Sequence, residues 1–207
     1  INGAGLFGAI GRFDQTDSEL WRNTLNINLF GTYLVSKHFL GLLLESRTKK
    51  IINFAGGGAF NAFPYYSAYA VSKAAVVRLS ETMAEELSEL GVQVNCVAPG
   101  FVATDIHAAT LAAGQQRAGD QFGATQRKMA EGSVPMSVPV ECVKFLVSPA
   151  SDGLQGKTIS ASFDRWDSSA FRESLDAISA SELYSLRRIN LIDLDPNDEL
   201  RQSLDGD

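Results

Sequence analysis

The arrangement that most constrains the fold is a pair of short apolar segments separated by one long helical segment. Residues 51–54 have the composition of a buried strand, and residues 92–97 have that of a second one. The sequence between them predicts a helix over residues 67–90 that ends at Gly91, because glycine commonly follows the last helical residue. Together these segments predict an α/β domain.

The predicted helix carries Tyr69 and Lys73, which are four positions apart. Side chains at this spacing lie one above the other on a helix, so the phenol and the ammonium can meet. A nearby cation lowers the pKa of a phenol from its usual value of about 10. A tyrosine tuned in this way can exchange a proton with an alcohol or carbonyl oxygen near neutral pH. Because such a pair also occurs by chance on surface helices, its surroundings decide the interpretation.

The segments around this pair follow a recognisable order. A glycine run at residues 56–58 precedes the helix, Pro99 and Gly100 follow the second strand, and residues 1–5 and 26–31 lie upstream. In this order and at these separations, residues 1–163 resemble the short-chain dehydrogenase/reductase family. The resemblance implies the C-terminal part of a Rossmann-like, doubly wound parallel sheet with flanking helices. It also implies hydride transfer between NAD or NADP and the carbonyl or alcohol carbon of a small molecule.

The resemblance assigns roles to individual positions. Tyr69 takes the place of the catalytic acid/base, Lys73 lowers the pKa of the phenol and holds the nicotinamide ribose, and Asn28 helps to carry a proton relay. Cofactor contacts are implied for Asn2, Ala4, Gly5, Tyr69, Lys73, Pro99, Gly100, Val102 and Thr104. Gly3 stands where the family has a second asparagine.

One departure concerns the catalytic serine that the family places thirteen residues before the tyrosine, which here is Gly56. Loss of one preorganised donor to a developing oxyanion typically costs ~10²–10³ in rate. A backbone N–H of the glycine run, Asn61 or the substrate itself are candidate replacements, and a serine restored at position 56 tests whether a donor is missing. The departure leaves two alternatives open: a catalytically impaired relative that binds a nucleotide or a partner, and a sugar-nucleotide epimerase or dehydratase.

A second departure concerns the phosphate-binding turn of dinucleotide folds. No Gly-x-x-x-Gly-x-Gly motif occurs in the sequence, which starts at Ile1 inside a family motif. We therefore expect residues 1–167 to form an incomplete domain without its first strands and its glycine-rich turn. Residues 168–207 are expected to form a partly helical extension with a loose, acidic end. A phosphate-cradle reading of residues 56–58 is disfavoured, since no helix begins directly after them.

Composition narrows the class of protein. With 207 residues, 45% hydrophobic and 20% charged, the chain has the profile of one soluble domain. A net charge of −6 argues against binding to nucleic acid. The sequence contains no run of 18 uncharged apolar residues, so no membrane span is predicted. Cys96 and Cys142 lack metal-type spacing and are expected to be buried free thiols in the cytoplasm. With only two histidines, no metal site is predicted.

The remaining segments are mostly helical. Thr16 and Glu19 form a plausible capping box for a helix that extends to about residue 46. This helix and that of residues 67–90 are apolar on more than one face, and family members pair the two across a dimer, so a homodimer or homotetramer is expected. Residues 106–135 are expected to form a mobile helical cap over the substrate, residues 138–147 a helix, and residues 157–161 a last strand.

Several side chains have two readings. Trp166, Arg187 and Arg188 suit an acidic or phosphorylated ligand, but packing of the tryptophan and pairing of the arginines with acids is the favoured interpretation. Thr104 either contacts the cofactor or caps the next helix. Tyr65 and Tyr66 either shape the substrate mouth or pack in the core.

Overall fold

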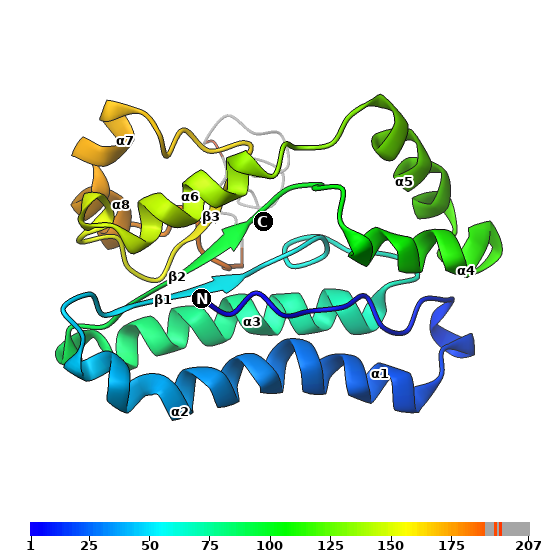
Figure 1. Cartoon of the computed structure of the whole chain (residues 1–207), viewed down its shortest axis with the longest axis horizontal. Coiled ribbons are helices and arrows are strands. Elements are labelled where there is room, and N and C mark those ends of the chain that lie inside the picture. Colours follow the sequence, from blue (N-terminus) through cyan, green and yellow to red (C-terminus); the bar gives the residue numbers. More distant parts are fainter. Residues whose placement is uncertain (189–192, 194, 196–207) are drawn as a thin grey trace, which may run out of the picture.

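The sheet has three parallel strands in the order β1-β2-β3 (Figure 1). A computed structural model of the chain describes residues 1–188, 193 and 195. The strands are β1 (Lys50–Phe54), β2 (Gln93–Ala98) and β3 (Thr158–Ser160), with Ile52 opposite Asn95 and Val97 opposite Ile159. On the free side of β1, Asn2 forms a parallel bridge to Asn53. All three predicted strands are confirmed, each to within a residue or two.

Helices cover both faces of this sheet and its carboxyl edge (Figure 1). One face carries α1 (Ser18–Leu25), a π-helical turn (Asn26–Phe30), α2 (Gly31–Glu45) and α3 (Ser67–Glu86), and the other carries α6 (Ser137–Val147). Beyond the carboxyl ends of the strands lie α4 (Ala108–Ala118) and α5 (Asp120–Glu131). The extension adds α7 (Ser169–Glu173) and α8 (Leu175–Ala180), and short 3-10 turns lie at Phe13–Gln15, Ser88–Leu90, Asp105–His107 and Pro149–Ser151. The predicted α/β class with flanking helices is therefore confirmed.

The start of α1 differs from the prediction. Asp17 is the N-cap, and its carboxylate accepts a hydrogen bond of 2.8 Å from the Leu20 amide. Thr16 instead donates its hydroxyl to the Phe13 carbonyl at 3.0 Å. The predicted capping box of Thr16 and Glu19 is wrong, because a carboxylate one position later caps the helix and also complements the positive end of its dipole.

Two apolar clusters hold the helices on the sheet. Between the sheet and α6 lie Ile52, Val97, Leu146 and Ile159, and between the sheet and α3 lie Val76, Val77 and Cys96. Cys96 and Cys142 are both buried free thiols, as predicted. Both faces of the sheet are therefore covered, which is the usual situation of a parallel sheet.

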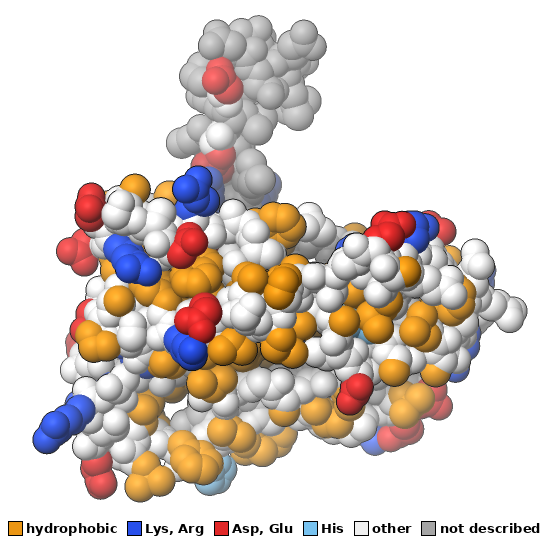
Figure 2. Space-filling model, turned by 45° about the horizontal axis from the view of Figure 1, so that its top comes forward, with side chains coloured by type: hydrophobic (Ala, Val, Ile, Leu, Met, Phe, Trp, Pro, Cys, Tyr) orange, Lys and Arg blue, Asp and Glu red, His pale blue; other side chains and the backbone are white. Residues whose placement is uncertain are grey.

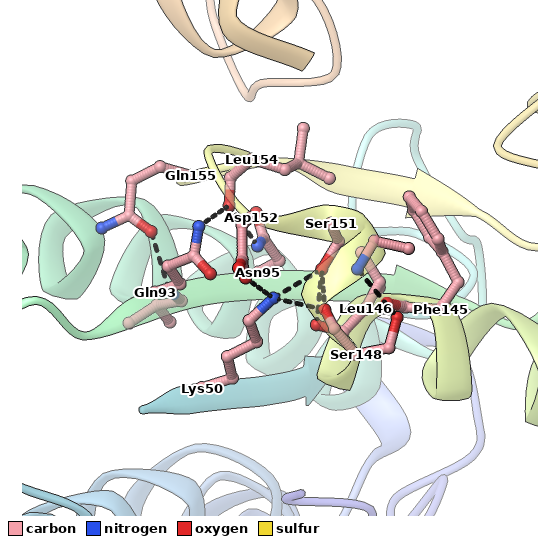
Figure 3. Close-up of polar contacts among 12 residues, drawn as sticks. Lys50, Gln93, Asn95, Phe145, Leu146, Ser148, Ser151, Asp152, Leu154 and Gln155 are labelled. Atoms are coloured by element: carbon pink, nitrogen blue, oxygen red, sulfur yellow. Dashed lines mark hydrogen bonds and ion pairs between the residues drawn. The ribbon is translucent and has the colours of Figure 1, made fainter. Parts of the chain in front are cut away.

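A polar network fastens the amino ends of the strands (Figure 3). The buried Lys50 ammonium donates to the Ser148 carbonyl at 2.7 Å and to the Ser151 hydroxyl at 2.8 Å, and it pairs with Asp152 at 2.7 Å. Nearby, the Asn95 amide donates to the Leu154 carbonyl at 2.8 Å. These bonds tie β1 and β2 to the connection between α6 and β3.

The C-terminal extension packs beside β3. The Thr158 amide donates to the Tyr184 carbonyl at 2.8 Å. The Trp166 indole donates to the Ala161 carbonyl at 3.0 Å and stacks on Phe145, and Arg187 pairs with Glu182 and Asp193. The packing interpretation of Trp166 and the pairing of Arg187 are therefore confirmed. The division into two domains stays a prediction, and the predicted loose, acidic end lies mostly outside the described residues.

The helical run from Ser18 to Glu45 is long and apolar enough to cross a membrane by length and composition alone. Only Lys37 and His38 interrupt its neutral residues between Arg22 and Glu45. Its polar residues Thr24, Asn28 and Thr32 are buried against the rest of the protein. The absence of a membrane partner accordingly stays a prediction.

Candidate functional site

Tyr69 and Lys73 lie in the first two turns of α3 and face the carboxyl end of β1. Both residues are only 6% exposed. The Lys73 ammonium donates to the carbonyl of Phe54, the last residue of β1, at 2.8 Å, and it lies 5.9 Å from the centre of the Tyr69 ring. The predicted shared helix face is confirmed.

The Tyr69 side chain is a buried ring with an unpaired hydroxyl. Phe7 packs edge-on against the ring at 4.7 Å between centroids, and Phe63 packs tilted at 6.3 Å. The hydroxyl makes no hydrogen bond to any described residue. It is not among the fully buried side-chain oxygens of that part of the chain that lack a hydrogen bond, which are Ser162 Oγ and the ion-paired Glu81 Oε2. The phenolic oxygen is thus not completely shielded from solvent, and it has no hydrogen-bond partner among the described residues.

The electrostatics of the pair differ from the prediction. Burial raises the pKa of Tyr69 to about 12, and burial lowers the pKa of Lys73 to about 8. The predicted lowering of the phenol pKa by its lysine neighbour is therefore wrong for this structure, because removal from water outweighs the attraction of the ammonium. At neutral pH the phenol therefore carries its proton and is a weaker acid than a free phenol.

Gly56 lies directly against the phenolic oxygen. A Cβ atom added at Gly56 would be 2.2 Å from Tyr69 Oη and 2.9 Å from Tyr69 Cζ. A serine at this position is incompatible with the present position of the ring. Restoring the family's serine is therefore a larger change than the sequence suggested, since Tyr69 has to move to admit it.

The rest of the glycine run forms a turn. The Ala59 amide donates to the Gly56 carbonyl at 3.1 Å, and Gly58 has a φ of 83°. These features fit a type II turn, whose third residue needs a positive φ. A Cβ at Gly58 would also lie 2.7 Å from the side chain of Ala70. Turn geometry and close packing account for Gly56 and Gly58 without a phosphate.

Asn28 lies in the π-helical turn before α2 and is fully buried. Its side chain accepts from the Leu6 amide and donates to the Leu6 carbonyl and to the Ser72 hydroxyl, each at 2.9 Å. A Cβ at Gly5 would be 3.3 Å from Asn28 Oδ1 and 3.5 Å from Lys73 Nζ. The structure thus brings Gly5, Asn28 and Lys73 together beside Tyr69, and the glycine leaves space open in front of them.

The other predicted cofactor residues are less closely grouped. The Asn2 amide group is turned into the fold, where it donates to Ser36 and Asn53 at 2.9 and 2.8 Å, and Ala4 is exposed. Pro99, Gly100, Val102 and Thr104 follow β2 at the same edge of the sheet as Tyr69, and no hydrogen bond joins them to it. Thr104 precedes the turn Asp105–His107 but does not cap it with its side chain.

Side chains from the cap (residues 106–135) and from the segment before α1 form an apolar cluster around Tyr69. Tyr66 is fully buried and donates its hydroxyl to Thr110 of α4 at 2.8 Å, which supports the packing interpretation for this residue. His107 stacks on Phe101 at 4.0 Å and meets Phe7 edge-on at 5.6 Å. No local pattern marked Phe7 or His107 as site residues, because their positions depend on contacts between distant segments. The predicted helical content of residues 106–135 is confirmed, while the mobility of this cap stays a prediction.

A cavity of about 660 Å³ opens at the carboxyl end of β3, lined in part by Val134, Ser162 and Trp166. A Cβ at Gly100 would be 2.8 Å from Ser162 Oγ and 3.0 Å from Val134. In the space-filling view, hydrophobic side chains form patches across the face shown, with charged residues scattered among them (Figure 2). The cavity adjoins the Pro99-Gly100 segment. Its lining residues include Trp166, which the sequence marked as a candidate ligand contact. No group of three or more metal-ligating side chains occurs among the described residues.

The comparisons with known proteins agree with this arrangement. Residues 1–114 match the family model described as short chain dehydrogenase. The chain is 30% identical over 175 residues to the short chain dehydrogenase pigC of Monascus ruber, which covers 84% of this chain and 54% of that protein. It is 39% identical over 104 residues to a protein of Xanthobacter autotrophicus named inactive 2-(S)-hydroxypropyl-CoM dehydrogenase 2, covering 50% of this chain and 45% of that one.

A solved structure extends the likeness to three dimensions. A gluconate 5-dehydrogenase from Burkholderia cenocepacia, in complex with NADP and tartrate, superposes with a TM-score of 0.65 at 25% identity over 77% of this chain and 60% of that chain. The chain spans about half the length of the curated relatives it matches. Since the family model matches more than half of its residues, the protein belongs to the short-chain dehydrogenase family.

Proposed function

We propose that the protein is an NAD(P)-dependent oxidoreductase that transfers a hydride between nicotinamide and a carbonyl or alcohol carbon, with Tyr69 as the acid/base group. The observation that carries this proposal is the unpaired, incompletely shielded hydroxyl of a buried tyrosine that shares a helix face with a buried lysine. Family membership and the names of similar dehydrogenases support the reaction class.

The residues of the site fit the nicotinamide end of the cofactor. The space kept open by Gly5 lies beside Asn28 and Lys73, where an ammonium can donate to ribose hydroxyls. Gly100, with a φ of 79°, and the residues that follow it lie at the same edge of the sheet. No glycine-rich turn for the pyrophosphate occurs in the 207 residues. The bound nicotinamide supplies or accepts the hydride.

The protein's own groups handle the proton. In the reducing direction, Tyr69 gives its phenolic proton to the carbonyl oxygen as the carbon receives the hydride, and the product is an alcohol. The Lys73 ammonium lies close enough to stabilise the phenolate that Tyr69 becomes. Asn28 anchors the segment of Leu6 and bonds Ser72, the neighbour of Lys73, and so keeps the site assembled. In the oxidising direction the same steps run in reverse.

The direct test is Tyr69→Phe in the complete gene product. The substitution keeps the ring and its packing on Phe7 but removes the transferable proton. We expect turnover of ketones to fall by at least ~10²-fold, the lower range for loss of acid–base catalysis, while binding of NADH or NADPH followed by fluorescence stays within a few-fold. Retention of the wild-type rate would show that Tyr69 is not the acid/base group.

A catalytically impaired relative that binds a nucleotide or a partner is a second candidate. It is favoured by the raised pKa of Tyr69 and by the absence of a side chain at Gly56. Binding of NADPH without reduction of any member of a broad carbonyl panel would support it. A sugar-nucleotide epimerase or dehydratase is the third candidate, and it would copurify with cofactor in stoichiometric amounts.

We further propose that the protein is a cytoplasmic homo-oligomer that binds neither nucleic acid nor membrane. The helical run from Ser18 to Glu45 exposes several large apolar side chains: Leu20, Phe30, Tyr33, Val35, Phe39 and Leu42. Exposed apolar side chains gathered along one helical run suit contact with a second copy of the chain. Light scattering should report a dimer or tetramer that Phe39→Glu with Leu42→Glu dissociates. A wild-type monomer at micromolar concentration would contradict the proposal.

A further inference from the structure

We propose that the backbone N–H of Gly57 donates a hydrogen bond to the substrate oxygen that Tyr69 protonates. The inference rests on the proposed function and assigns the group that holds the reacting oxygen. It follows from the contact between Gly56 and Tyr69 and from the unpaired amides of the turn.

The first observation is that the glycine loop, rather than a side chain, borders the phenolic oxygen. The ideal Cβ position of Gly56 lies 2.2 Å from Tyr69 Oη. The space that a side-chain donor at this position would occupy is therefore filled by the tyrosine itself. An oxygen that bonds to Tyr69 Oη on the side of this loop has the loop backbone as a neighbour.

The second observation is that the loop of residues 56–59 contains backbone amides without a hydrogen-bond acceptor. Ala55 donates its amide to the Val97 carbonyl and Ala59 donates to the Gly56 carbonyl, at 2.9 and 3.1 Å. The amides of Gly57 and Gly58 between them have no protein acceptor in the described part of the chain. The Gly57 nitrogen is two bonds from the Gly56 Cα that faces the phenol. A backbone donor of this kind acts like the N–H groups of oxyanion holes.

The chemistry needs such a donor. As the hydride adds to the carbonyl carbon, the C=O π electrons move to the oxygen, which becomes negatively charged until the proton from Tyr69 reaches it. The Gly57 N–H keeps its proton and stabilises this charge by a hydrogen bond. Burial of Tyr69 keeps competing water away from its ring, which strengthens electrostatic interactions in the site.

The turn allows the donor to be removed on its own. Gly57 is the second residue of the turn over residues 56–59, and its φ lies outside the left-handed region. Proline is common at this position of type II turns, so Gly57→Pro removes the amide proton and preserves the turn. Gly57→Ala is the matched control, because its Cβ meets Phe63 at an ordinary 3.6 Å and its amide is retained.

In the complete gene product, we expect the kcat of Gly57→Pro to lie ~10²–10³-fold below that of Gly57→Ala, which retains the amide proton. Both variants should bind NADPH, followed by fluorescence, as the wild type does. Equal kcat values for the two variants would overturn the inference but not the proposed function. A wild-type protein that binds NADPH yet reduces no carbonyl overturns both.

A second variant keeps the inference testable if Gly57→Pro does not fold. Gly56→Ser offers a side-chain hydroxyl but displaces Tyr69 from its present position. We expect it to lower kcat and to shift the ultraviolet titration of Tyr69. The Tyr69 signal is identified as the one that the Tyr69→Phe variant lacks. A higher kcat in Gly56→Ser would show that the wild-type site lacks a hydrogen-bond donor, and the assignment of Gly57 would be wrong.

Discussion

A buried lysine lies at each end of the sheet, and the two lysines differ in how many polar partners they have. At the amino end, Lys50 has three partners, namely the Ser148 carbonyl, the Ser151 hydroxyl and the Asp152 carboxylate. At the carboxyl end, Lys73 has one hydrogen bond, to the Phe54 carbonyl, and the phenol beside it has none. A fully paired polar group stabilises the fold, whereas a buried polar group with spare capacity costs stability and remains available to a ligand. The comparison predicts a structural role for Lys50 and a role in ligand binding for Lys73.

The sharpest way to break this comparison is Lys73→Met. Because burial lowers the pKa of Lys73 to about 8 from 10.5, folding at neutral pH carries a cost of about 3 kcal/mol at 1.36 kcal/mol per pKa unit. We expect the variant to be more stable than wild type at pH 7 in urea unfolding, by up to about that amount, and to lose turnover.

The difference in unfolding free energy between Lys73→Met and wild type is expected to depend on pH. Between pH 8 and 10.5 the unfolded chain binds the Lys73 proton and the folded chain does not, so wild-type stability rises with pH in this window. The advantage of Lys73→Met should therefore shrink as the pH approaches 10.5. Above pH 10, the raised pKa of Tyr69 lowers the stability of both proteins alike, because the folded phenol keeps its proton up to about pH 12, so this effect cancels from their difference. A constant difference across this range would contradict the assignment.

Lys50→Met should have the opposite effect on stability. It leaves the Ser148 carbonyl and the Ser151 hydroxyl without their charged donor, and an unsatisfied buried polar group costs about 1–3 kcal/mol. We expect urea unfolding to show a loss of that size, while kcat of the folded enzyme stays unchanged because the site is at the other end of the strands. The exposed Arg47→Met is a control that should do neither. A kcat that falls with Lys50→Met would show that the two ends are coupled.

How much of the fold and of the site could be predicted depends on how far apart in the sequence the contacting residues lie. The shared face of Tyr69 and Lys73 follows from a spacing of four residues within one helix, and the strands follow from local apolar runs. The Lys50 network joins residues about a hundred positions apart, and no local pattern marks such a pairing. The shift in the Tyr69 pKa depends on Phe7 and on the cap, which bury the ring from distant parts of the chain. The spacing alone therefore indicated which groups meet but gave the wrong direction for the phenol pKa.

The smallest expected effect concerns the start of α1, where the competing readings differ by one residue. Asp17→Ala removes the carboxylate that accepts from the Leu20 amide, and loss of an N-cap typically costs ~1 kcal/mol. Thr16→Ala removes only an exposed hydroxyl bond to the Phe13 carbonyl, so its effect should be a few tenths of a kcal/mol at most. Urea unfolding of the two variants, with kcat as a check, ranks them. A larger loss for Thr16→Ala would restore the capping box and contradict the assignment of Asp17 as the N-cap.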